Sequence, residues 1–255
     1  MKKLATLVLA CLVLFGATQL ARADDSLTIA AGAGYKKLVT ALGKAFTAET
    51  GIETQQIYGN MGQVTAQAQN SGVVDTVIGD KRYLDGSDLP FSTEYVIGKG
   101  KLVLAVAKGV SLPAVFDLKV LDAESAPKVL TDPAVTRIAH PDAKKAIYGR
   151  AATQFLANTG LAEQLEPKLI EVGTVPQVSA YVVNGEVDLG FINLTDGYAI
   201  QDRAARIIPV DEALYEPITI VAKTLNGCPS PDIAKRFGEF LQTDTARAIA
   251  TKHGL

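Results

Sequence analysis

The chain has 255 residues, of which 48% are hydrophobic and 20% charged, and its formal net charge is −2. This length is enough to bury a large core in one or two compact units. The acidic balance makes nucleic acids and anionic membrane surfaces poor candidate partners, because both carry negative charge.

The first 23 residues are predicted to be an export signal. Lys2 and Lys3 give a positive start, residues 4–15 form a short apolar run, and "ARAD" offers a small-residue cleavage site after Ala23. The run is too short to cross a bilayer as a helix, which needs about 20 apolar residues. An alternative interpretation takes "VLAC" as a lipoprotein signal that lipidates Cys11. In either case we expect the mature chain to be periplasmic.

Cleavage after Ala23 changes the charge and the cysteine content. Three positive residues and no acid leave with the signal, so the formal charge goes from −2 to −5. Cys228 is then the only cysteine. An intramolecular disulfide and a multi-cysteine zinc site are therefore excluded, and the pattern assigns no role to Cys228.

Short β-branched runs alternate with helical patterns along the mature chain, which is typical of an α/β architecture with mostly parallel sheets. In chain order we expect strands at residues 27–31, 52–58, 75–79, 136–140, 169–172, 188–192 and 206–210. Helices are expected at residues 34–50, 62–70, 148–158, 176–184, 231–242 and 244–253.

One internal similarity predicts two lobes of the same design. "GQVTAQAQNSGVVDTVIGD" from Gly62 resembles "PQVSAYVVNGEVDLGFINLTD" from Pro176, and the two begin about 110 residues apart. In each, a helix with Gln and Val in its first turn ends near Asn and Gly before a strand led by Val-Asp. The alternative is chance, because glycine ends many helices.

Two further runs are predicted to cross between the lobes. "GKLVLAVAKG" at 100–109 and "EPITIVAKT" at 216–224 share an apolar core that ends in Val-Ala-Lys. If both are hinge strands, residues 24–102 form the first part of lobe one, residues 103–220 form lobe two with the hinge strands, and residues 221–255 return to lobe one. A cleft between two hinged lobes is a common place for a small ligand.

The stretch "TIAAGAGYKKLV" at 28–39 places glycines between a strand and a helix. The dinucleotide pattern G-x-G-x-x-G fails because Lys37 stands in place of the third glycine. The phosphate-loop pattern fails as well, because Lys36 is followed by Lys37 instead of Ser or Thr. What remains is a helix start whose unpaired amides could hold an anion, or a simple tight turn.

Three more helix starts have the same character. They are "YGNMGQV" at 58–64, "KKAIYGRAA" at 144–152 and "GTVPQV" at 173–178. Each follows a predicted strand or a short loop beyond one, which is the edge of an open α/β sheet where ligands bind. Four helix starts, two from each lobe, could therefore converge on one oxyanion.

At these residues the chain resembles the periplasmic molybdate-binding proteins, which are group II solute-binding components of ABC importers. Besides the loops above, "AIYGRAATQFLANTGLAEQLEPKLIEV" resembles the helix of their second lobe, and "KRFGEFLQTDTARAIATKHGL" resembles their C-terminal helix pair. The resemblance covers nearly the whole mature chain. It implies a two-lobed type II periplasmic-binding-protein fold, with a mostly parallel, helix-flanked sheet in each lobe and two hinge crossings.

The resemblance also implies a function. The chain would bind a small oxyanion of the molybdate or tungstate type and deliver it to an inner-membrane ABC permease, as a monomer without a cofactor. Carried over by position, the family's ligand contacts fall on Gly34, Met61, Ala146, Val175 and Asn193. The family typically has hydroxyl residues at the first two positions and often a tyrosine at the last, so three side-chain hydroxyls are missing here.

The predicted ligand-binding set combines these positions with their neighbours. Backbone amides would hold the anion, Asn60 or Asn193 could add a side-chain amide, and Gly34 leaves room that would favour a larger anion with an organic part. The full set is Ala33, Gly34, Tyr35, Asn60, Met61, Gly62, Ala146, Ile147, Tyr148, Val175 and Asn193. Arg150 could grip a carboxylate or phosphate, or it could brace its helix through an ion pair.

Enzymatic and metal functions have less support in the sequence. His140 and His253 are the only histidines, and no nucleophile-elbow or zinc-protease motif occurs, so we expect no catalysis. Asp80, Asp85, Asp88 and Asp142 match no recognised cation loop. A metal ion or an organic acid as the ligand, and an exported sensory or adhesive role without transport, stay open as alternatives.

Overall fold

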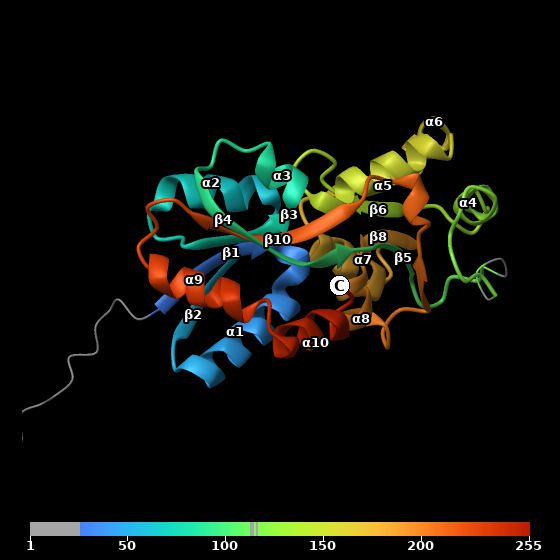
Figure 1. The fold of residues 1–255 in the computed structure, drawn as a ribbon. Coiled ribbons are helices and arrows are strands. Elements are labelled where there is room, and N and C mark those ends of the chain that lie inside the picture. Colours follow the sequence, from blue (N-terminus) through green and yellow to red (C-terminus); the bar gives the residue numbers. More distant parts are fainter. Residues whose placement is uncertain (1–25, 113–114, 116) are drawn as a thin grey trace, which may run out of the picture.

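The computed structural model describes residues 26–112, 115 and 117–255, so the predicted export signal lies outside the described residues. The chain forms two α/β lobes that lie side by side, each built on a five-stranded sheet (Figure 1). We call the lobe around the sheet β2-β1-β3-β10-β4 the first lobe, and the lobe around the sheet β7-β6-β8-β5-β9 the second lobe. The predicted two-lobed α/β fold is confirmed.

The strands match the apolar runs of the sequence closely. The first lobe contains β1 (Ser26–Gly32), β2 (Glu53–Gly59), β3 (Thr76–Asp80), β4 (Phe91–Gly100) and β10 (Ile218–Leu225). The second contains β5 (Leu102–Val106), β6 (Ile138–Pro141), β7 (Leu169–Val172), β8 (Leu189–Asn193) and β9 (Arg206–Pro209). All seven strands expected outside the crossings are present, whereas β4 was not expected, because much of it is exposed and only its pairing with β10 defines it.

The sheets are mixed and not mostly parallel, which corrects one detail of the prediction. In the first lobe β1 runs parallel to β2 and β3, but β10 runs antiparallel to β3 and β4. In the second lobe β6 runs parallel to β7 and β8, but β5 runs antiparallel to β8 and β9. Strands β5 and β10 each follow a crossing from the other lobe, and no helix returns them to the parallel direction.

The expected helices are all present within two residues of their predicted ends. They are α1 (Lys36–Thr50, preceded by the 3₁₀ turn η1, Ala33–Tyr35), α2 (Met61–Ser71), α5 (Ile147–Asn158), α7 (Val175–Asn184), α9 (Pro231–Phe240) and α10 (Asp244–Lys252). The structure adds the shorter helices α3 (Lys81–Asp85), α4 (Ser125–Leu130), α6 (Ala162–Leu165) and α8 (Leu194–Ile200), and the turns η3 (Glu166–Lys168) and η4 (Glu212–Leu214). Short helices show too few turns for a clear apolar period, so sequence patterns miss them.

The internal similarity of the sequence corresponds to a repeated structure. Helices α2 and α7 both end at a glycine in the left-handed region, Gly72 with φ 65° and Gly185 with φ 71°. After each glycine an aspartate fixes the next strand to its neighbour. Asp75 accepts hydrogen bonds from the Thr28 and Ser230 amides at 2.8 and 2.7 Å. Asp188 accepts from two consecutive amides, at residues 136 and 137, at 2.8 and 2.9 Å.

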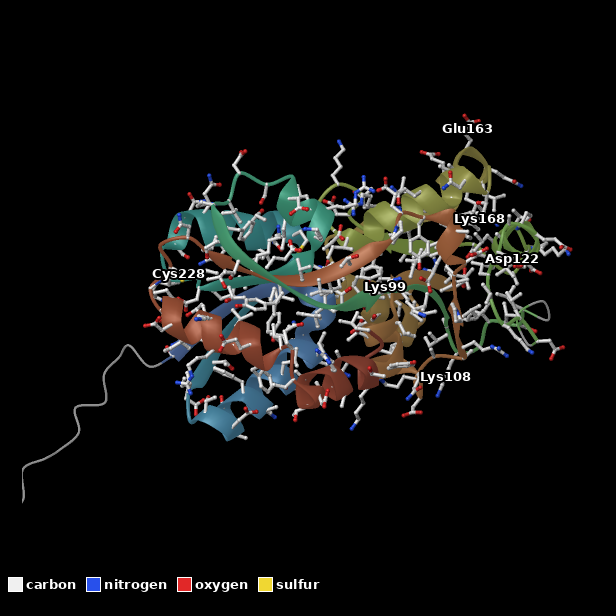
Figure 2. The ribbon with its side chains drawn as sticks, in the orientation of Figure 1. Lys99, Lys108, Asp122, Glu163, Lys168 and Cys228 are labelled. Atoms are coloured by element: carbon white, nitrogen blue, oxygen red, sulfur yellow. The ribbon has the colours of Figure 1, made fainter. Side chains whose placement is uncertain are left out.

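Two short segments join the lobes. The first passes from β4 through Lys101 into β5, and the second runs from β9 through η4 into β10. Lys99, near the end of β4, lies in the middle of the molecule where the lobes meet (Figure 2). These segments are where a hinge motion would bend the chain, while the division into domains at residues 102 and 220 stays a prediction.

The Asp188 contacts predict a dependence of stability on pH. Burial alone would raise the pKa of this carboxyl, but hydrogen bonds from Thr136 and Arg137 lower it below its ordinary value of 3.8. A lowered pKa in the folded state stabilises the protein above pH 3.8, and this contribution is lost as the pH falls further. We expect the urea midpoint of Asp188→Asn to depend less on pH between about 5 and 3 than that of the wild type. An equally steep dependence in both proteins would contradict this.

Candidate ligand-binding site

A small cavity lies between the lobes, where helices from both of them begin. Its volume is about 30 Å³, roughly the room of two water molecules. From the first lobe come η1 and the start of α2, and from the second come the starts of α5 and α7. The cavity is lined by Gly32, Ala33, Gly34, Tyr35, Gly59, Asn60, Met61, Ala146, Ile147, Tyr148, Thr174 and Val175.

The structure brings nine of the eleven predicted ligand-binding residues to this one cavity. Gly62 and Asn193 are the two that do not line it. Gly32, Gly59 and Thr174 line it and were absent from the prediction. The internal similarity offered a signal for Thr174, because it stands before α7 as Asn60 stands before α2. That any of these residues contacts a ligand stays a prediction.

The starts of α2 and α7 are fixed by the same device. At α2 the Asn60 Oδ1 accepts from the Gln63 amide at 3.0 Å, and Gln63 Oε1 accepts from the Asn60 amide at 3.0 Å. At α7 the side-chain oxygen of Gln177 accepts from the Thr174 amide, also at 3.0 Å. Each glutamine therefore occupies the amide of the residue before its helix. The first amide inside the helix is left for another partner.

Some of these first amides are free and one is not. Ile147 opens α5 and Val175 opens α7, so neither amide has an acceptor within its own helix. None of the described residues outside the helices accepts from these two amides. The Met61 amide, at the start of α2, donates to the Lys145 carbonyl of the second lobe at 2.8 Å. The free donors nearest the cavity therefore come mainly from the second lobe.

Two asparagine side chains also join the lobes directly. Asn193, at the end of β8, donates from Nδ2 to the Gly34 carbonyl at 2.9 Å and accepts at Oδ1 from the Asp196 amide at 3.1 Å. Asn60 Nδ2 donates to the Gly173 carbonyl at 3.3 Å. Neither amide group waits unused for a ligand, contrary to the expectation that one of them would.

The expectation that Gly34 makes room for an organic part of the ligand is wrong. A Cβ at Gly34 would lie 3.1 Å from Asn193 Nδ2 and 3.2 Å from Val175 Cβ. The space beside the glycine is therefore already filled by side chains of the second lobe. Glycine at this position allows the two lobes to approach closely.

Met61 contributes an apolar wall. Its side chain is buried and lies against Gly79 of β3, where an added Cβ would collide with Met61 Cε and lie 2.8 Å from Sδ. A Cβ at Gly32 would lie 3.5 Å from the same sulfur. The thioether thus fills the volume between two glycines of the first sheet, which is a packing role.

No charged side chain lines the cavity among the residues that the structure describes. Arg150, on α5, instead forms an ion pair with Asp80 at the end of β3, which links the two lobes. Asp80 is completely buried, and its Oδ1 has no hydrogen-bond partner in the described part of the chain. Of the two interpretations of Arg150, the bracing ion pair is the one that the structure contains.

The acids considered as metal ligands are dispersed. Asp85 pairs with Lys81 and Lys223, and Asp142 accepts from the Lys144 and Lys145 amides. No group of three or more His, Cys, Asp or Glu residues lies close enough to share a metal ion within residues 26–112, 115 and 117–255. Cys228 is buried at the end of the first lobe that faces away from the second (Figure 2).

Comparison with known proteins places the fold and this site in a family. The family described as bacterial extracellular solute-binding protein matches residues 27–255. The chain belongs to this family. Bacterial extracellular solute-binding proteins of this kind serve ABC importers, and within the described residues of this one no helix has both the length and the apolarity to cross a membrane.

Individual members of the family narrow the comparison. A molybdate-binding protein from Rhodobacter capsulatus is 27% identical over 231 residues, which is 88% of this chain and 86% of that protein. The structure of the periplasmic molybdate-binding protein of Azotobacter vinelandii has a TM-score of 0.77 at 23% identity and covers 89% of this chain and 97% of that one. The L-phospholactate-bound structure of PEB3 shares the fold, with a TM-score of 0.68 at 13% identity, over 89% of this chain and 98% of that one.

Proposed function

We propose that this solute-binding protein captures a small oxyanion of the molybdate or tungstate type in the periplasm and delivers it to an inner-membrane ABC permease. One observation carries the proposal: helix starts from both lobes surround one cavity that no charged side chain lines among the described residues. In this proposal the protein acts as a monomer, without a cofactor and without catalysis. Residues 1–23 direct its export, and the lobes divide at residues 102 and 220.

The physical reason is the positive end of each helix. The unpaired first amides and the aligned peptide dipoles give a helix start a partial positive charge of roughly half a unit. Helices α5 and α7 both point such ends at the cavity, and their Ile147 and Val175 amides have no other acceptor. An anion would satisfy both amides together, whereas a cation would face only donors.

The size of the cavity favours a compact anion over an organic acid. A volume of about 30 Å³ leaves no room for a carbon chain, and Asn193 and Val175 fill the space beside Gly34. A tetrahedral oxyanion has five non-hydrogen atoms and is larger than two water molecules. Its binding therefore requires the lobes to separate slightly, which would break the Met61–Lys145 main-chain hydrogen bond and free a further amide for the ligand.

Closure of the lobes would follow from differential binding. A ligand favours the closed arrangement only through contacts that it makes there and lacks when the lobes are open. An anion held by η1 and α2 on one side and by α5 and α7 on the other meets this condition. A permease could then distinguish the loaded protein by the relative position of the lobes.

A thermal-shift screen of residues 24–255 tests the proposal. The ligands are molybdate, tungstate, sulfate, phosphate, simple carboxylates and divalent metal ions, each at a large excess. A ligand present at a hundredfold excess over its dissociation constant adds about 2.7 kcal/mol to the apparent stability, which is easily measured. We expect molybdate or tungstate to give the largest shift. A shift with a divalent cation alone would show that the ligand is not an anion.

Transport remains to be separated from a sensory or adhesive role. The cleft geometry is the same for each, because all three begin with ligand capture. Genes for a permease and an ATPase beside the gene for this chain would favour transport, and loss of oxyanion uptake on deletion of the gene would establish it. Unchanged uptake at limiting oxyanion concentration would favour the other roles.

A further inference from the structure

Two buried tyrosines meet between the lobes beside the cavity. Tyr35 belongs to η1 of the first lobe and Tyr148 to α5 of the second, and their hydroxyl oxygens are hydrogen-bonded to each other. The side chains are 1% and 2% exposed, their ring centroids are 6.2 Å apart, and both residues line the cavity. The pair is thus a contact between the lobes and part of the cavity wall.

The pair lies directly against the first hinge segment. A Cβ at Gly100, the last residue of β4, would collide with the Tyr148 hydroxyl and lie 2.8 Å from that of Tyr35. Position 100 must therefore be glycine for the two hydroxyls to meet. The backbone at Gly100 closes the side of the pair that faces the hinge and leaves the cavity on another side.

The two hydroxyls carry one more proton than their mutual hydrogen bond uses. Each tyrosine hydroxyl has one proton to donate and can also accept. The bond between them takes one proton, and neither hydroxyl has a second hydrogen-bond partner among the described residues. Burial raises the pKa of both tyrosines far above the ordinary value of 10.0, so both protons are present at physiological pH. One buried donor is left without an acceptor.

We infer that Tyr35 and Tyr148 donate this remaining proton to an oxygen atom of the bound ligand. The inference rests on the proposed function, because it takes an anion in the cavity as the acceptor. The tyrosine pair then supplies a side-chain hydroxyl to a site whose positions 34, 61 and 193 carry none. It also links ligand binding to closure, because the two hydroxyls meet only when the lobes do.

The competing acceptor is the carboxylate of Asp80. It is buried nearby, and its Oδ1 has no partner in the described part of the chain, so a water molecule could connect it to the tyrosine pair. In that case the hydroxyls would stabilise the fold and leave ligand affinity unaffected. The two possibilities therefore differ in a measurable quantity.

Calorimetric titration with molybdate, or with the oxyanion that gives the largest thermal shift, tests the inference on Tyr35→Phe, Tyr148→Phe and the double variant. Phenylalanine keeps the ring packing and removes only the hydroxyl. The dissociation constant of the double variant should rise roughly 10- to 150-fold, the range for a hydrogen bond to a charged acceptor. Either single variant that keeps a hydroxyl within reach of the ligand should lose less, so the two losses should not add.

Tyr215→Phe is the matched control. Its hydroxyl is buried at the second crossing, accepts from the Leu102 amide at 3.1 Å and does not line the cavity. Its affinity should stay within about twofold of the wild type, since no ligand contact is removed. A double variant within twofold of the wild type would overturn the inference and leave the proposed function standing. A wild type that binds no oxyanion would overturn both.

The single variants keep the test decisive if the double variant does not fold. One of them should then weaken binding at least fivefold without a matching change in melting temperature. Two folded single variants that both bind within twofold of the wild type would overturn the inference.

Discussion

Gly34→Asp should weaken oxyanion binding far more than Gly34→Asn. Gly34 lines the cavity, and a Cβ there fits only if Asn193 and Val175 give way by a few tenths of an ångström. Both variants meet this steric demand equally, so their difference isolates the charge. At an effective dielectric constant of about 20, a carboxylate about 4 to 8 Å from an anion costs about 2 to 4 kcal/mol. The aspartate variant should therefore bind roughly 30- to 1,000-fold more weakly than the asparagine variant.

Calorimetric titration with molybdate measures this difference, and melting curves without ligand show whether the two variants are equally folded. Raising the salt concentration should reduce the difference, because ions screen the repulsion between exposed charges. Equal affinities of the two variants would mean that the first loop does not face the anion, and the position of the proposed site would be wrong.

Arg150→Ala should destabilise the protein more than Asp80→Asn does. The alanine leaves the Asp80 carboxylate buried, with both oxygens unpaired, whereas the asparagine leaves a partly exposed guanidinium that water can solvate. Removing one partner of a buried ion pair typically costs about 3 to 5 kcal/mol. For a chain of this length the melting temperature should fall by roughly 6 to 20 °C, towards the lower end because Arg150 is partly exposed.

The double variant Asp80→Asn, Arg150→Ala completes a thermodynamic cycle. It should be more stable than Arg150→Ala alone, because no charge is then buried without a partner. Opening of the lobes could also relieve the burial of Asp80, and small-angle X-ray scattering would detect it as an increased radius of gyration. An Arg150→Ala protein with an unchanged melting temperature and an unchanged radius of gyration would contradict the assignment of this ion pair as a lobe-to-lobe brace.

The sequence predicts the repeated architecture because the same local rules act twice. Gln63 and Gln177 cap their helices, Gly72 and Gly185 end them, and an aspartate begins the strand that follows. Each step depends on residues close together in the chain, so it can be read from the order of residue types. The convergence of four helix starts follows from this repetition, because equivalent loops lie at equivalent edges of the two sheets.

The contacts between the lobes could not be predicted in the same way. The Asp80–Arg150 pair, the Tyr35–Tyr148 pair and the Asn193–Gly34 hydrogen bond join residues 70 to 159 positions apart. Their partners depend on how closely the lobes approach, which local patterns do not encode. For the same reason the free space at Gly34 was misjudged, because the side chains that fill it belong to the other lobe.

A crystal structure of residues 24–255 with the oxyanion selected by the thermal-shift screen tests the central claim most directly. The account predicts anion oxygens within about 2.7 to 3.2 Å of the Ile147 and Val175 amides, with at least one further donor from the first lobe. An anion bound elsewhere, or held by one lobe alone, would contradict it.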